Sequence, residues 1–317
     1  MKLVLKYTLL LLIALTNHSV CAQDWKPKGT IGLLVGSPPG GAIDTVARIT
    51  SQIFSSMGWS SIVSNKPGAD QALAANYVAR SQPNGLTILV AGSVPMAENI
   101  VNPGPAVEYK ITDFEPVIAV SANSFLLLTH PSLQVNSYSE FQSWTRKNPN
   151  LYNLGVWAKF PHTIMKEISR LERMPTPQEI PFKGSAPSMT QLRGGHIPFA
   201  VDNYVGARAL LETNKVVALA VFDNQKANIF PGLPVISHKY PQFETFHWSG
   251  LYVPAGTPAN IVSTLNKIVN EGLNDPKVRY TIESVGFRVI GGTPANLKKI
   301  NEQTIVFIEN MLSLERK

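Results

Sequence analysis

A glycine-rich loop between an apolar run and a helix-like segment is the part of the sequence best suited to binding an anion. The loop consists of Ser37, Pro38, Pro39, Gly40 and Gly41. It follows a predicted buried strand, Ile31–Val35, and precedes a segment with helical spacing. Backbone N–H groups of such a loop and of the next helix N-terminus bind anions, carboxylates included, without a charged side chain. An ordinary tight turn is the alternative.

An acidic residue follows the loop at the start of the predicted helix. This residue, Asp44, can cap the helix or orient the loop through its carboxylate. It would also repel a negatively charged ligand. We therefore expect Asp44 to organise the loop rather than to contact an anion.

Other predicted strands and turns end in polar, aromatic or small residues. These candidates are Ser93 and Val94 after Leu86–Ala91, Trp157, Lys159, Phe160 and His162 after Tyr152–Val156, Gly184, Ser185 and Ala186 in a strand-to-helix turn, and Asp202 after Phe199–Val201. Hydroxyls and amides can orient a ligand, and apolar side chains can enclose it. Structural roles remain open: Ser185 and His162 can cap helices, and Asp202 can bind a neighbouring loop. Lys159 can lie in a solvated loop.

The motifs of common enzymes are absent from the chain. It contains no His-Glu-x-x-His, Gly-x-Ser-x-Gly, Gly-x4-Gly-Lys or Gly-x-Gly-x-x-Gly pattern. The six histidines are scattered, and no two have the spacing of metal ligands. We expect no cofactor, no metal and no covalent chemistry. A secreted hydrolase that uses His162 or Asp202 is the alternative.

The N-terminus has the three parts of a secretory signal peptide. Lys2 and Lys6 make it basic, Tyr7–Leu15 forms a short apolar region, and Val20-Cys21-Ala22 supplies small residues at a cleavage site. We predict cleavage after Ala22 and a periplasmic mature protein without cysteine. The apolar region is too short for an ordinary transmembrane helix, and no later segment is apolar enough to span a bilayer. A membrane anchor and a lipidated Cys21 are the alternatives.

The net charge of the chain and its distribution limit the partners that we expect. The whole chain has a formal net charge of +7, which falls to +5 without Lys2 and Lys6. The basic residues are spread thinly and form no run. We therefore expect no nucleic-acid partner and a mild attraction for small anions.

The predicted secondary structure alternates strands with helices. Strands are expected at Ile31–Val35, Ile62–Val63, Leu86–Ala91, Tyr152–Val156, Phe199–Val201, Val216–Val221 and Trp248–Val253, and helices at Ile43–Met57, Ala72–Arg80, Tyr138–Lys147 and Met189–Arg193, with a loop and helix within Phe160–Leu171. This order implies parallel sheets covered by helices, with ligands at the carboxyl ends of the strands. The apolar run Phe114–Thr129 is long for one strand. Two strands joined by a crossing between domains are therefore expected there.

The C-terminal part contains a short repeat. Residues 256–260, Gly-Thr-Pro-Ala-Asn, recur at 292–296. In each copy, Thr can cap a helix whose first residue is Pro. We predict two helices with similar starts and no duplicated domain.

Seven stretches of this sequence resemble the periplasmic receptors of tripartite tricarboxylate transporters, also called Bug-type solute-binding proteins. They are Pro38–Asp44 (PPGGAID), Asn65–Ala69 (NKPGA), Pro83–Thr87 (PNGLT), Asp113–Val117 (DFEPV), Pro181–Pro187 (PFKGSAP), Asp202-Asn203 and Pro254–Pro258 (PAGTP). They run in the family's order and span nearly the whole chain after the predicted signal peptide. One stretch alone would be weak, whereas seven in order are specific.

The resemblance implies α/β architecture with two doubly wound domains joined by crossing strands, a type II periplasmic-binding-protein-like flytrap. We expect a signal peptide at residues 1–22, a first domain at 23–122 and 247–317, and a second domain at 123–246. The resemblance further implies a monomer that captures a small carboxylate for the membrane permease subunits of such a transporter. A ligand-presenting adaptor for a membrane sensor kinase is the alternative.

The family's binding residues carry over to two regions of this chain. Its members hold a ligand carboxylate with the loop after the first strand, here residues 37–41, and with a second-domain loop, here Lys159–His162. The resemblance implies that the far end of the ligand meets groups near Ser93, Ser185 and Asp202.

The chain departs from the family's pattern at three places. Asp70-Gln71 stand where the family usually has Gly-Gly, and residues 155–161 read GVWAKFP where the family is rich in Gly and Ser. Residues 93–96 read SVPM where members often have Thr-Ser or Ser-Gly. These changes give the expected cleft larger and more apolar side chains, and they add one cation. An aromatic or otherwise partly apolar monocarboxylate is therefore the expected ligand.

Overall fold

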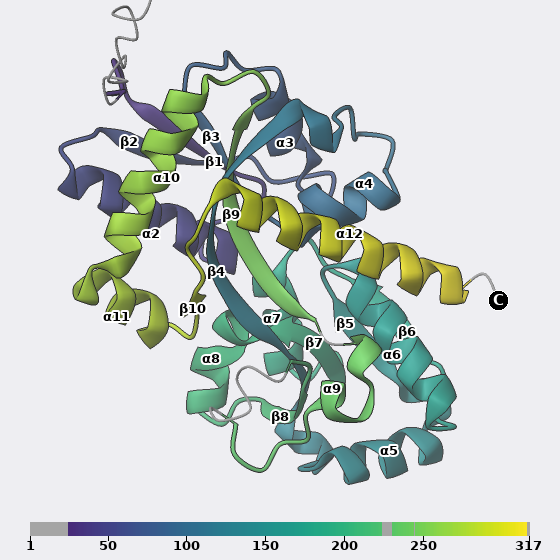
Figure 1. Cartoon of the computed structure of the whole chain (residues 1–317). Coiled ribbons are helices and arrows are strands. Elements are labelled where there is room, and N and C mark those ends of the chain that lie inside the picture. Colours follow the sequence, from purple (N-terminus) through teal and green to yellow (C-terminus); the bar gives the residue numbers. More distant parts are fainter. Residues whose placement is uncertain (1–24, 224–229, 244, 316–317) are drawn as a thin grey trace, which may run out of the picture.

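The chain folds into two α/β lobes that share two long strands (Figure 1). The computed structural model describes residues 25–223, 230–243 and 245–315. Strands β4 (Phe114–Thr129) and β9 (Phe246–Pro254) run from one lobe into the other, and helix α12 (Pro294–Glu315) lies across them. We call the region where the lobes meet around β4 and β9 the lobe junction. This architecture confirms the expected two-lobed α/β fold.

The predicted domain boundaries fall within the two strands that the lobes share. The predicted signal peptide, residues 1–22, lies outside the described residues. The boundaries expected after residues 122 and 246 fall within β4 and at the start of β9. Both positions divide strands that the two lobes share, and the assignment of domains stays a prediction.

The first lobe is built on a mixed sheet, in which the short strand β10 (Arg288–Val289) also pairs antiparallel with β4. It contains β1 (Ile31–Val35), β2 (Ser61–Asn65), β3 (Thr87–Gly92) and helices α2 (Ala42–Ser56), α3 (Ala72–Ala79), α10 (Ala259–Asn274) and α11 (Pro276–Ser284). β1 pairs with β2 and β3 in parallel, whereas β9 runs antiparallel to β3. The strands and helices predicted for residues 31–92 are therefore confirmed within a few residues. The sequence pattern did not indicate α11.

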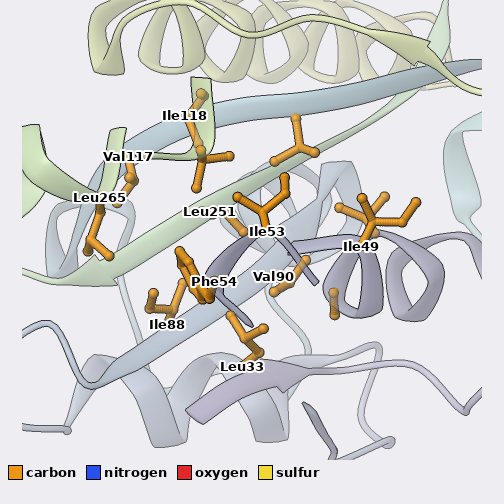
Figure 2. Packing of buried hydrophobic residues seen from close by; sticks show 14 of the residues in the cluster. Leu33, Ile49, Ile53, Phe54, Ile88, Val90, Val117, Ile118, Leu251 and Leu265 are labelled. Atoms are coloured by element: carbon orange, nitrogen blue, oxygen red, sulfur yellow. The ribbon is translucent and has the colours of Figure 1, made fainter. Parts of the chain in front are cut away.

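The spacing of apolar residues in α2 has a direct structural reason. Ile43, Val46, Ile49 and Ile53 share one face of the helix, and each is at most 5% exposed. This face packs on β1, β3 and β9, as Figure 2 shows for Ile49 and Ile53 among their neighbours. Burying a side chain of this size stabilises a fold by about 1.5–3 kcal/mol relative to leaving it exposed.

The second lobe repeats the plan of the first. It contains β5 (Asn153–Val156), β6 (Gln178–Pro181), β7 (Phe199–Asn203), β8 (Val217–Val221) and helices α5 (Tyr138–Lys147), α6 (Lys159–Leu171), α7 (Ser185–Arg193), α8 (Tyr204–Glu212) and α9 (Ile236–Lys239). β5 pairs in parallel with β6 and β7. The strands and helices that were predicted for this region are confirmed in their order, whereas α8 and α9 were not expected. β6 was not expected, because it is an edge strand whose residues are largely exposed.

The prediction of two strands within residues 114–129 is wrong, because β4 is one continuous strand of 16 residues. Its first part pairs with β9 in the first lobe, and its last part pairs with β7 and β8 in the second. The polar centre of β4 stays in the strand because neighbours satisfy part of it. Ser121 Oγ lies 2.8 Å from Ser249 Oγ on β9. A register shift between Ala119 and Ser121 bends the strand there.

Helix α12 contributes to the cores of both lobes. Leu297 near its start belongs to a cluster with Trp248 and Tyr252 of the first lobe. Ile308 and Met311, further along, pack in the main cluster of the second lobe. None of the helices in the described ranges combines the length and the apolar character that a membrane span requires.

The two repeated helix starts differ in how they are capped. Before α12, the hydroxyl of Thr293 accepts a hydrogen bond from the Asn296 N–H at 3.3 Å, as predicted. Before α10, the hydroxyl of Thr257 donates to the Pro254 carbonyl oxygen at 2.7 Å instead. α10 then begins after Pro258, so the predicted Thr257 cap is wrong.

Gly250 on β9 sets how closely α12 packs on the sheet. A Cβ atom added there would lie 2.7 Å from Leu297 Cδ1 and 3.0 Å from the Ile118 carbonyl oxygen. We expect Gly250→Ala to lower the free energy of unfolding by about 1–3 kcal/mol, because overpacking displaces the helix. Urea unfolding followed by circular dichroism measures this change. Gly32→Ala on β1 is the matched control, since its added Cβ comes no closer than 3.4 Å to a neighbour. Equal stability of the two variants would contradict the prediction.

Candidate functional site

A buried carboxylate organises the loop of residues 37–41. Asp44 Oδ2 accepts hydrogen bonds from the Gly40 N–H and from Arg48 Nε, both at 2.9 Å. Asn65 Nδ2 donates to Asp44 Oδ1 at 3.0 Å and to the Ser37 carbonyl oxygen at 2.9 Å. Burial raises the pKa of Asp44, but the bonds from Arg48, Gly40 and Asn65 outweigh it and hold the pKa below its usual value. Asp44 therefore orients the loop, as expected.

The same loop presents a hydroxyl and a helix N-terminus. Ser37 Oγ is buried and has no hydrogen-bond partner among the described residues. Gly40 has a φ of 86°, a backbone conformation that side chains disfavour. Gly41 is the N-cap residue of α2 and contributes no side-chain cap. An anion placed here would face the positive end of the α2 dipole.

The predicted turn of the second lobe approaches this loop. Gly184 is the N-cap residue of α7, and a Cβ atom added to it would lie 3.6 Å from Pro38 Cδ. Ser185 at the start of α7 is buried, whereas Ala186 is exposed. The N-termini of α2 and α7 thus approach each other across the lobe junction.

Asp202 is a fully buried carboxyl at the end of β7. Its Oδ1 accepts hydrogen bonds from Trp157 Nε1 at 3.0 Å and from the Asn203 N–H at 2.7 Å. Oδ2 has no partner in the described part of the chain. Burial raises the pKa of Asp202 to about 7, although the hydrogen bonds from Asn203 and Trp157 and the nearby Ser185 hydroxyl lower it in part. Three predicted site residues, Trp157, Ser185 and Asp202, therefore lie together.

Aromatic and polar residues of β4 and β9 form the floor beside Asp202. The Trp157 ring lies 5.4 Å from the ring of His247 and 6.0 Å from that of Phe125, centroid to centroid. Burial lowers the pKa of His247 to about 4, so its imidazole is neutral at neutral pH. His247 stands opposite Asn123 in the β4–β9 pairing. Neither His247 Nδ1 nor the Asn123 side-chain amide has a partner among the described residues.

A cavity of about 270 Å³, lined by apolar and by charged residues, lies between the lobes and shares Trp157 with the group around Asp202. Four predicted site residues line it: Val94, Trp157, Lys159 and Phe160. Val94 opens a short helix, η1 (Val94–Glu98), which continues into α4 (Asn99–Val101). Residues 104–107 and the C-terminal half of α12 complete the wall. The part of these four residues in ligand binding stays a prediction.

The structure places other predicted residues apart from this group. His162 is directed toward the β6 side, with Nδ1 3.2 Å from Glu179 Oε2 and Nε2 3.3 Å from the Pro177 carbonyl oxygen. Ser93 lines a different hollow, of about 340 Å³, against α12. The role of Ser93 and His162 in binding stays a prediction.

Sequence reasoning missed Asn123, Phe125 and His247. A signal for Asn123 was present, since a polar residue in a long apolar run implies a buried amide. His247 gave no such signal among six scattered histidines. Its position depends on the register of β9 against β4, which the sequence does not state.

A family model covers most of this chain. Residues 46–311 match the model described as tripartite tricarboxylate transporter family receptor. Among curated proteins, the protein BugT of Bordetella pertussis is 27% identical over 279 residues. The match covers 86% of this chain and 85% of BugT.

Two solved structures share the fold over nearly the whole chain. A protein of R. palustris with adipate superposes with a TM-score of 0.84 and 28% identity, covering 92% of this chain and 98% of that one. MatC from Rhodopseudomonas palustris with bound malate gives a TM-score of 0.80 and 26% identity, covering 90% and 99%. By its sequence and its fold, this chain belongs to the family of tripartite tricarboxylate transporter receptors.

Proposed function

We propose that this receptor captures a small carboxylate at the lobe junction and delivers it to a membrane permease. Receptors of its family are periplasmic solute-binding proteins. One observation carries the proposal: the Ser37 hydroxyl, the Asn123 amide, His247 Nδ1 and Asp202 Oδ2 are buried without a partner among the described residues. Each such group costs about 1–3 kcal/mol, so a ligand that pairs with it gains affinity.

The charge state of these groups suits an anionic ligand. His247 is neutral, because burial lowers its pKa to about 4. Asp202 is mostly protonated below its raised pKa of about 7, so it can donate a hydrogen bond rather than repel a carboxylate. Together with the N–H groups at the α2 N-terminus, these groups offer hydrogen-bond donors to a carboxylate, and none of them is a cation.

Related receptors support the carboxylate class. The R. palustris neighbour was solved with adipate, and MatC was solved with malate. Both ligands are small carboxylates. We carry this class, and not either compound, to the present chain.

The inter-lobe cavity favours a ligand with an apolar part. Val94, Trp157 and Phe160 enclose it. Its charged lining consists of three acidic residues, Asp70, Glu98 and Glu179, against one basic residue, Lys159. A second carboxylate in this hollow would meet like charges. We therefore infer an aromatic or otherwise partly apolar monocarboxylate, bound by a monomer whose lobes close on it by a hinge in the shared strands.

A thermal-shift screen tests the ligand class. We expect benzoate or phenylacetate to raise Tm, whereas citrate and succinate leave it unchanged. A ligand present at 100 times its Kd stabilises the folded state by about 2.7 kcal/mol, which is a measurable shift. If citrate or succinate stabilises the protein and aromatic acids do not, the inferred ligand class is wrong while the carboxylate function stands.

Replacement of Gly41 tests the first loop. Its φ of −81° suits any residue, and an added Cβ would lie 3.7 Å from the Pro38 carbonyl oxygen and 3.9 Å from Ser37 Oγ. Gly41→Val should therefore fold normally while its side chain fills the space beside the Ser37 hydroxyl. We expect at least a tenfold loss of affinity for the acid found in the screen, measured by calorimetry.

The control for this variant is Gly29→Val. Gly29 is exposed and precedes β1, at the opposite end of that strand from the loop. The Gly29→Val protein should bind the same acid as tightly as the unmodified protein does. Unchanged affinity of Gly41→Val would remove the first loop from the site.

A further inference from the structure

A buried glutamate bridges the two lobes. Glu98 ends η1 in the first lobe, and its side-chain Oε2 accepts a hydrogen bond from the backbone N–H of Lys159 at 3.0 Å. Lys159 is the first residue of α6 in the second lobe. Glu98 is 8% exposed, so this bond lies inside the molecule. It joins parts of the chain 61 residues apart.

Helix α6 has no cap of its own. Its N-cap residue is Ala158, which provides no side-chain acceptor, and its first turn contains no acidic residue. The first N–H groups of a helix need acceptors from outside it, and a carboxylate there also interacts favourably with the helix dipole. Glu98 supplies this acceptor from the other lobe, and the Phe160 N–H acts on the same carboxyl.

We propose that Glu98 is a positioning residue that favours the closed arrangement of the lobes by capping α6 across the junction. This proposal rests on the proposed function, in which the lobes open and close around a ligand. When the lobes separate, α6 loses its cap and Glu98 becomes hydrated. We use the term closed for the arrangement of this structure, in which Glu98 reaches α6. The cap exists only in that arrangement and needs no ligand.

The surroundings of Glu98 decide how its charge affects closure. Glu98 lines the inter-lobe cavity together with three titratable groups, Asp70, Lys159 and Glu179. The α12 side of the cavity is apolar, with Ile308, Met311 and Leu312. Oε1 has no partner among the described residues. A charged Glu98 is thus poorly solvated when the lobes are closed.

The pH dependence follows from this burial. Desolvation raises the pKa of Glu98 to about 7, although the N–H and charge of Lys159 lower it in part. In separated lobes the pKa returns toward its ordinary value of 4.5. The closed arrangement then binds the proton more tightly, so its advantage is complete below the open-state value and is lost as pH rises through about 7. Between pH 6 and pH 8, the ratio of closed to open molecules should fall about tenfold.

Distances between spin labels on the two lobes test the proposal. Labels are placed at Gln52→Cys on α2 and Lys147→Cys on α5, both exposed, in a chain whose single natural cysteine, Cys21, lies in the predicted signal peptide. Pulsed electron paramagnetic resonance then gives the closed and open fractions at pH 6 and pH 8 with no carboxylate added. The unmodified Glu98 protein should show the tenfold change. Because no ligand is used, failure of the proposed function would not affect this result.

Two variants separate the cap from the charge. Glu98→Gln keeps an acceptor but cannot titrate, so its closed fraction should be the same at both pH values. Glu98→Ala removes the acceptor, so this protein should be mostly open at both pH values. Glu115→Gln, an exposed glutamate on β4, is the matched control and should behave as the unmodified protein. Circular dichroism confirms that each variant is folded.

Two outcomes would overturn the proposal. The first is a Glu98→Ala protein with the same distances as the unmodified protein at both pH values. The second is a pH dependence that persists in Glu98→Gln, which would assign the titration to Asp202, the other buried carboxyl with a raised pKa.

Discussion

The antiparallel pairing of β4 with β9 is the interaction on which the rest of the structure depends. The two strands pair between residues 114 and 124 of β4 and 246 and 254 of β9, and β4 then continues into the second lobe. Strand pairing satisfies the backbone groups of both strands while still allowing twist between them. The two lobes are thereby held together by a continuous, hydrogen-bonded pair of strands.

This pairing also builds the floor of the candidate site. It places His247 opposite Asn123. The next residue but one of β4, Phe125, pairs with Asn203 of β7 and lies against Trp157. The polar atoms of this floor are buried and partly unpaired, which costs stability that an apolar core would not lose. Local departures from good packing of this kind are typical of functional sites, where the missing partner comes from a ligand.

Charge is handled differently at three buried carboxyls near the junction. Asp44 lies among donors that lower its pKa, so it stays ionised and orders the loop of residues 37–41. Asp202 and Glu98 are buried with fewer donors, and the pKa of each rises to about 7. The first carboxylate is a fixed structural charge. The other two change charge near neutral pH, and we propose that the effect on ligand binding belongs to Asp202 and the effect on lobe closure to Glu98.

The sequence by itself determined the strands and helices with clear apolar spacing, such as those of residues 31–92, the glycine-rich loop with its orienting Asp44, and the family. These features depend on local spacing and on short motifs, which act over a few residues. Only the tertiary structure decided that β4 is one strand, that Trp157 binds Asp202, and that Glu98 caps α6. Each of these depends on pairing or burial between segments far apart in the chain. Hydrogen-bond partners and the polarity around a carboxyl come from the packed molecule, because a residue's own neighbours in sequence do not set its burial.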